Sequence, residues 1–136
     1  MSWRRSLVRI ATFNVDEMMK RLAAIVERRE EAEVRLAVLH AERDSETRRA
    51  TLDADAGWYR LGYLEGWRAR RDAIGLEIQV LNAEETGARD ALALAYEELK
   101  KYEHIEEGAL NAERLLEARK EAAALDEMGM RMAARR

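Results

Sequence analysis

Two stretches of the chain place their hydrophobic residues at alternating intervals of three and four, which is the spacing of one face of an α-helix. In the first half this stripe consists of Val15, Met18, Leu22, Ile25, Arg29, Ala32, Leu36, Leu39, Arg43, Glu46 and Ala50. In the second half it consists of Trp67, Arg71, Ile74, Ile78, Leu81, Glu85, Ala88, Leu92, Ala95 or Tyr96, Leu99, Tyr102, Ile105 or Glu106, Ala109, Glu113 and Leu116. A stripe sustained over several heptads predicts two long helices with coiled-coil seams, each interrupted by a few charged residues.

The glycines predict where the chain reverses direction. Four of the seven glycines lie between Gly57 and Gly75, and proline is absent. Because glycine near a helix end permits the backbone conformations that reverse a chain, we place the turn at about residues 57–66. The prediction is therefore an all-α, single-domain antiparallel coiled-coil hairpin, with one arm at about 5–56 and the other at about 67–133.

A turn centred near residue 62 also predicts which residues face each other. Arg29 then faces Glu97, Arg43 faces Glu85 and Asp53 faces Arg71, so that several interruptions of the seam meet an opposite charge. The same register leaves residues 125–136 without a partner on the first arm. A lone amphipathic helix is marginally stable in water, so this overhang is expected to fray or to dock elsewhere.

The hairpin would give the molecule two ends of different chemistry. At the terminal end it would gather six arginines and several methionines, and methionine-rich surfaces adapt to partners. At the turn end lie Trp58, Tyr59, Tyr63 and Trp67, and exposed Trp and Tyr are frequent binding anchors. Two plainer interpretations remain open: the arginines are solvated helix ends, and the aromatic residues only close the turn end of the coil.

Composition excludes several classes of function. Zero cysteines exclude disulfide and thiolate chemistry, and a net charge of −3 disfavours a nucleic-acid partner. No apolar run is long enough to insert into a membrane. The expected register does not bring the two histidines, His40 and His104, opposite each other, so we expect no metal site. A thin coil offers no enclosed pocket, so we also expect no cofactor and no enzymatic activity.

The closing segment adds a resemblance to a known family. It runs from Arg119 through Leu125, Asp126, Glu127 and Met128, with further arginines to the end of the chain. This pattern, the Arg-rich opening before Met19-Lys20-Arg21-Leu22-Ala23, the length and the two-arm layout resemble the FliJ family of flagellar type III export proteins. The aromatic-rich turn at 57–63 departs from that family.

The resemblance implies a cytoplasmic stalk, peripherally associated with the inner membrane at the flagellar base. It would be a monomer that links the hexameric export ATPase to the large membrane export-gate protein and escorts export chaperones. We expect the ATPase to contact Arg4, Arg5, Arg9, Asp126, Glu127, Met128, Met130, Arg131, Met132, Arg135 and Arg136. We expect the export gate to contact Trp58, Tyr59, Tyr63 and Trp67. The alternatives are a flagellar export chaperone that binds rod or filament subunits, a generic coiled-coil scaffold, and a helical nucleic-acid-binding arm, which the net charge disfavours.

Overall fold

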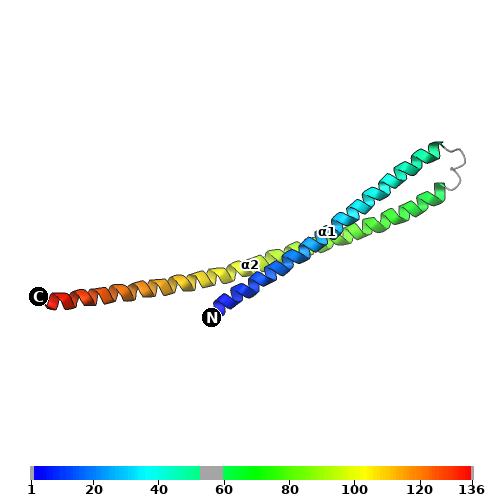
Figure 1. Cartoon of the computed structure of the whole chain (residues 1–136). Coiled ribbons are helices and arrows are strands. Elements are labelled where there is room, and N and C mark those ends of the chain that lie inside the picture. Colours follow the sequence, from blue (N-terminus) through cyan, green and yellow to red (C-terminus); the bar gives the residue numbers. More distant parts are fainter. Residues whose placement is uncertain (1, 53–59, 136) are drawn as a thin grey trace. The chain divides into compact units, whose positions relative to one another are not determined.

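The computed structural model describes residues 2–52 and 60–135, all but a few of which lie in two long α-helices. Helix α1 spans Trp3–Leu52 and helix α2 spans Arg60–Ala134 (Figure 1). The side-chain oxygen of Ser2 accepts a hydrogen bond of 3.2 Å from the backbone N–H of Arg4, which caps the first turn of α1. No strand is present in the described ranges, so the predicted all-α hairpin of two helices is confirmed.

The predicted turn is too long at its C-terminal side. Helix α2 already begins at Arg60, so residues 60–66 are helical, while residues 57–59 lie outside the described part. No described glycine has a positive φ, and a side chain added at Gly62 or Gly66 would enter open space. A glycine inside a helix costs only about 1 kcal/mol relative to alanine, which a helix of this length tolerates.

The contacts of the chain divide it into two compact units. One unit comprises Met1–Val15 and Leu94–Arg136, and the other comprises Asp16–Ala93. In both units a segment of α1 runs antiparallel to a segment of α2. The two units are described separately below.

The unit Asp16–Ala93 has a narrow apolar seam. Its buried residues are Ile25, Ala32, Leu39, Trp67, Leu81 and Ala88. In the other unit the buried residues are Ala11, Val15 and Ala95. All of these except Ala11 belong to the predicted stripes, so the sequence identified which face of each helix is buried. The seams are thin because each helix contributes about one buried side chain per heptad.

Ion pairs between the helices define the register in the unit Asp16–Ala93. Arg35 contacts Glu77 at 2.8 Å, Arg28 contacts Glu84 at 3.7 Å, and Arg70 contacts Glu42 at 4.0 Å. Each of these pairs is centred on position 56 of the chain, six residues before the predicted centre of the turn.

Two of the three predicted charge pairs are therefore wrong, and the third involves a residue outside the described ranges. Arg29 contacts Glu85 at 3.3 Å and not Glu97, and the guanidinium of Arg43 lies over the Trp67 ring and not beside Glu85. Arg71 also lies over that ring, and its predicted partner Asp53 lies outside the described residues. The error follows from including the helical glycines Gly62 and Gly66 in the turn, which displaced every expected partner by about twelve residues.

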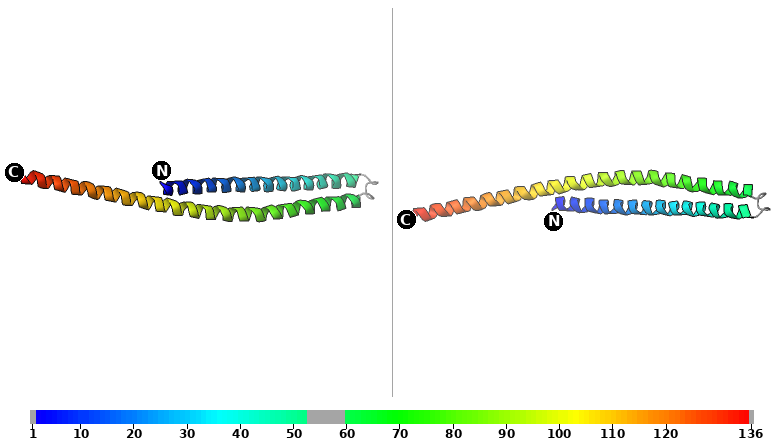
Figure 2. Two further views of the ribbon diagram at one scale, coloured as in Figure 1. Left: turned by 90° about the horizontal axis from the view of Figure 1, so that it is seen from below. Right: turned by 90° about the horizontal axis from the view of Figure 1, so that it is seen from above.

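In the other unit the start of α1 lies against residues 106–113 of α2. Arg4 contacts Glu113 at 3.2 Å, and Arg5 contacts Glu106 at 3.6 Å. Every described residue from Asn111 to Arg135 is exposed. Both views of Figure 2 show this end of α2 extending past the start of α1. The overhang, which we call the α2 tail (residues 114–134), thus starts earlier than the predicted 125–136, as the corrected register requires.

Candidate interaction surfaces

The aromatic cluster expected at the turn end is only partly described. Trp58 and Tyr59 lie outside the described residues, Tyr63 is half-buried, and Trp67 is 1% exposed. The prediction of Trp67 as an exposed binding anchor is therefore wrong, because its ring is already used inside the seam. For Trp67 the plainer interpretation, in which the aromatic ring fills the coil, agrees with its burial.

Polar and charged groups surround the Trp67 ring. Its indole Nε1–H donates a hydrogen bond of 2.8 Å to the carbonyl oxygen of Leu39. The guanidinium carbons of Arg43 and Arg71 lie 4.6 Å and 5.2 Å from the ring centroid. The His40 ring approaches edge-on at 5.2 Å, with an interplanar angle of 66°. This arrangement holds the two helices together and leaves no ring face for a partner.

Shallow hollows flank the seam near Trp67, and sequence analysis did not identify them. One is lined by Leu36, His40, Arg71, Asp72, Gly75, Leu76 and Gln79. The other is lined by Arg35, Val38, Leu39, Glu42, Arg70, Ala73 and Ile74. Both contain an exposed hydrophobic residue, Leu76 in the first and Val38 in the second. The sequence did hold one signal for these hollows, since Leu76 and Val38 are large apolar residues that lie outside the predicted stripes.

The arginines at the two ends of the chain do not form one basic cluster. Arg4 and Arg5 are paired with Glu113 and Glu106, whereas Arg131 pairs with Glu127 within its own helix at 3.1 Å. Arg131 lies eighteen residues beyond Glu113, or roughly 27 Å along the helix at about 1.5 Å per residue. The expected juxtaposition is wrong because α2 extends past the start of α1.

The remaining described residues that are expected to contact the ATPase are exposed. Arg9 lies on the surface of α1. The α2 tail and its end present Asp126, Glu127, Met128, Met130, Arg131, Met132 and Arg135 to solvent. Arg136 lies outside the described residues. The tail therefore carries most of the predicted set without any contact from α1.

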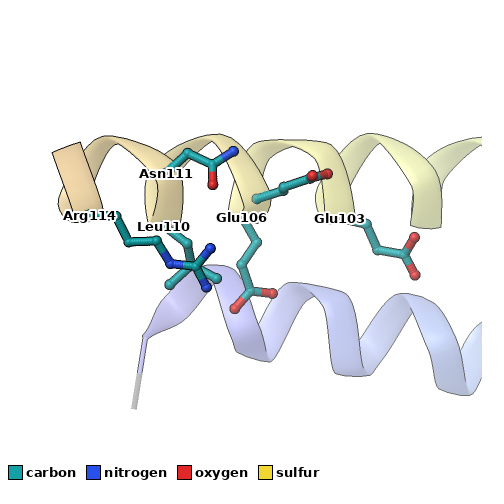
Figure 3. A pocket seen from close by; sticks show the side chains of 6 residues that line it. Glu103, Glu106, Leu110, Asn111 and Arg114 are labelled. Atoms are coloured by element: carbon teal, nitrogen blue, oxygen red, sulfur yellow. The ribbon is translucent and has the colours of Figure 1, made fainter.

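A hollow lies where α1 begins against α2. It is lined by Glu103, Glu106, Glu107, Leu110, Asn111 and Arg114. Figure 3 shows Glu106 and Leu110 pointing toward the first turns of α1, while Asn111 points away. The hollow is open and acidic on one side, so it resembles a contact strip between helices more than an enclosed ligand site.

The ion pairs shift three pKa values in the unit Asp16–Ala93. The hydrogen bond from Arg35 lowers the pKa of Glu77, and the same bond raises the pKa of Arg35. A hydrogen bond to Glu33, together with the charge of Glu85, raises the pKa of Arg29. All three shifts favour the charged forms, so these pairs remain ionised at neutral pH.

The described residues offer no assembled site for metal chemistry. Within 2–52 and 60–135, no group of three or more His, Cys, Asp or Glu residues is arranged to hold a metal ion. Helices with the length and apolar character needed to cross a membrane are likewise not found in these ranges.

Comparison with known proteins gives a consistent result across the chain. The family model described as Flagellar FliJ protein matches residues 5–136. Flagellar FliJ proteins from two strains of Caulobacter vibrioides are each 46% identical over 136 residues, covering 97% of this chain and 95% of the relative. No solved structure gives a significant match.

Proposed function

This chain belongs to the FliJ family of flagellar proteins, and on that basis we propose that it is a non-enzymatic stalk of the flagellar type III protein export apparatus. In this role it connects the hexameric export ATPase to the large membrane export-gate protein and escorts export chaperones. It acts as a monomeric hairpin in the cytoplasm, at the inner-membrane face of the flagellar base.

The observation that carries the proposal is the exposed α2 tail. A continuous helix of about twenty residues, all of them exposed, has the form of a shaft that enters a ring. Its methionines Met128, Met130 and Met132 are unbranched and adaptable, which suits the irregular inner surface of an oligomer.

The revised ATPase contact is confined to the end of α2. Arg4 and Arg5 already hold α1 against α2, so we assign them to the hairpin and not to the ATPase. The proposed contact residues are Asp126, Glu127, Met128, Met130, Arg131, Met132, Arg135 and Arg136. Arg9 is left out, because it lies on α1 away from this end of α2.

Deletion of residues 125–136 tests this assignment. We expect the shortened chain to lose co-purification with the flagellar export ATPase from the same organism, while its far-UV circular dichroism stays that of a helical hairpin. The matched control is Leu76→Ser, which alters an exposed apolar residue in the other unit and should leave ATPase binding unchanged. ATPase binding that survives the deletion contradicts the assignment.

The export-gate contact is proposed for three of the four aromatic residues named at the turn end. Trp58, Tyr59 and Tyr63 remain in the proposed set, and Trp67 is removed because it is buried. The double variant Trp58→Ala/Tyr59→Ala should weaken binding to the export-gate protein and leave ATPase binding intact. Loss of both activities with reduced helicity would indicate a folding defect and would contradict the gate assignment.

The proposed monomer has its own test. Multi-angle light scattering should give a mass near 15.7 kDa across the micromolar range. A mass near twice that value would instead support the scaffold alternative, in which two copies associate through both arms.

A further inference from the structure

One face of α2 continues past the start of α1. Beyond that point it still carries glutamates, the residue type that pairs with the arginines of α1 along the contact. Along the contact with α1, this face presents Glu106 and Glu113, which pair with Arg5 and Arg4. Beyond the contact it presents Glu117 and Glu121 at four-residue intervals, which keeps them on one side of the helix. A shallow hollow joins the two parts and is lined by Leu110, Glu113, Arg114, Glu117, Ala118 and Glu121.

The two outer glutamates form no ion pair among the described residues, although Arg114 lines the same hollow. Both are exposed, and among the ion pairs of the described residues Glu113 is paired by Arg4, whereas Glu117 and Glu121 have no partner within 4 Å. Carboxylates four residues apart on one helix repel each other. A cation that contacts Glu117 and Glu121, in the way that Arg4 contacts Glu113, relieves this repulsion.

The face also offers a surface for close packing. Ala118 and Ala124 lie beside the glutamates at helical spacing, and the exposed Leu125 and Met128 follow on the same side. Small residues let a neighbouring helix approach, and the apolar residues give it an area to bury. The acidic charge of this face disfavours binding of nucleic acid and of anionic lipid. The contact with α1 shows that a helix carrying arginines binds the neighbouring part of the same face.

We propose that this strip, residues 113–128 of α2, binds a basic amphipathic helix of a partner protein, which continues the coiled coil where α1 starts. The partner helix places Arg or Lys against Glu117 and Glu121, as this chain places Arg4 against Glu113, and its apolar residues cover Leu125 and Met128. The inference goes beyond the proposed function, because it states the chemistry of the bound helix and does not depend on which protein supplies it.

The test uses the full chain and a synthetic helical peptide of 21 residues. The peptide has Leu and Ala on one face and Arg at flanking positions, and a scrambled peptide of the same composition disrupts that face. Fluorescence anisotropy should show micromolar binding of the first peptide at 150 mM salt. The double variant Glu117→Lys/Glu121→Lys should weaken binding at least tenfold, and a rise in salt should weaken it further.

Asp90→Lys/Glu97→Lys provides the matched control, because it changes the net charge by the same amount. Both residues are exposed and lie on α2 outside the strip at residues 113–128. The control should bind the peptide within twofold of the unaltered chain. Circular dichroism should show equal helicity for both variants.

Three results would overturn the inference. They are no binding of the helical peptide, equal binding of the scrambled peptide, and equal loss of binding in the control. The last two would mean only general attraction between opposite net charges. Because the glutamate variants retain residues 125–136, this test can fail while the ATPase assignment stands, and the reverse also holds.

Discussion

The indole Nε1–H of Trp67 in α2 donates a 2.8 Å hydrogen bond to the carbonyl oxygen of Leu39 in α1. Within the unit Asp16–Ala93 this bond joins the two helices across the seam, and the ring is also covered by the guanidinium groups of Arg43 and Arg71. A buried tryptophan requires a partner for its N–H, and here the partner is a backbone group of the facing helix. Trp67 therefore fixes both the spacing and the axial position of the helices.

Replacement of Trp67 should destabilise the hairpin more than replacement of any other aromatic residue in the described ranges. We expect Trp67→Ala to lower the free energy of unfolding by about 3–5 kcal/mol, because it leaves a cavity in a thin seam. Trp67→Phe retains most of the packing but loses the hydrogen bond, and should cost about 1 kcal/mol or somewhat more. Urea unfolding followed by circular dichroism at 222 nm measures both values.

Trp3→Ala is the control for that experiment. Trp3 is 65% exposed, so its removal should change the free energy of unfolding by less than about 0.5 kcal/mol. Equal effects of Trp3→Ala and Trp67→Ala would contradict the central role of the Trp67 contacts.

The sequence predicted the buried face well but not the register, for a physical reason. Apolar spacing reports which side of a helix is buried, and Ile25, Ala32, Leu39, Leu81 and Ala88 are buried as that spacing requires. Register depends on where the turn is centred, and glycine composition is an ambiguous signal because a helix interior tolerates glycine. Because the predicted centre of the turn was wrong by six residues, residues such as Arg29 were assigned the wrong partners on the facing helix.

The candidate sites were affected by the same error. The exposed methionines of the α2 tail could be identified from composition, but the basic cluster depended on the position of the chain ends and was not found. Ala11 was missed because the predicted stripe began at Val15. The hollows beside Val38 and Leu76 depend on how two helices pack, which periodicity within one helix does not report.

The register can be tested by chemical cross-linking, since the chain has no cysteine of its own. The double variant Arg35→Cys/Glu77→Cys places two thiols where the structure has an ion pair of 2.8 Å. A short bismaleimide should cross-link it efficiently within one chain, as detected by mass spectrometry of the digested protein. The control Arg35→Cys/Asp90→Cys represents a turn centred near residue 62 and should cross-link poorly, because Asp90 lies about 20 Å further along α2. The opposite order of yields would restore the register expected from the glycines.

The ion pair between Arg35 and Glu77 should make stability depend on pH in the acid range. The hydrogen bond from Arg35 lowers the pKa of Glu77 below its ordinary value of 4.5, so the folded protein holds that proton less tightly than the unfolded chain. The stabilisation is therefore fully present above the ordinary pKa and is lost as the pH falls through the lowered one. The pair is solvent-accessible, so the effect is modest and weakens with salt.

Melting temperatures measured from pH 7 to pH 3 should reveal this dependence. Glu77→Gln should melt below the unaltered chain at neutral pH, and the gap should close as the pH approaches 3. Glu97→Gln, at an exposed position, provides the control and should show no such gap. A gap that stays constant across the range would show that Glu77 acts through packing and not through its charge.

The α2 tail should be the least protected helical segment of the unit that contains the start of α1. An isolated helix of about twenty residues is marginal in water, and every described residue from Asn111 onward is exposed. Residues 95–109 pack against α1 through Ala95 and its neighbours, so their backbone amides open less often. Hydrogen–deuterium exchange should therefore show amides of residues 116–134 exchanging at least tenfold faster than those of 95–109. If the helical partner peptide binds the strip at residues 113–128, its addition should slow exchange there and leave the Glu117→Lys/Glu121→Lys variant unaffected. Equal protection of the two segments in the free protein would mean that the tail is held by a contact that α1 does not supply.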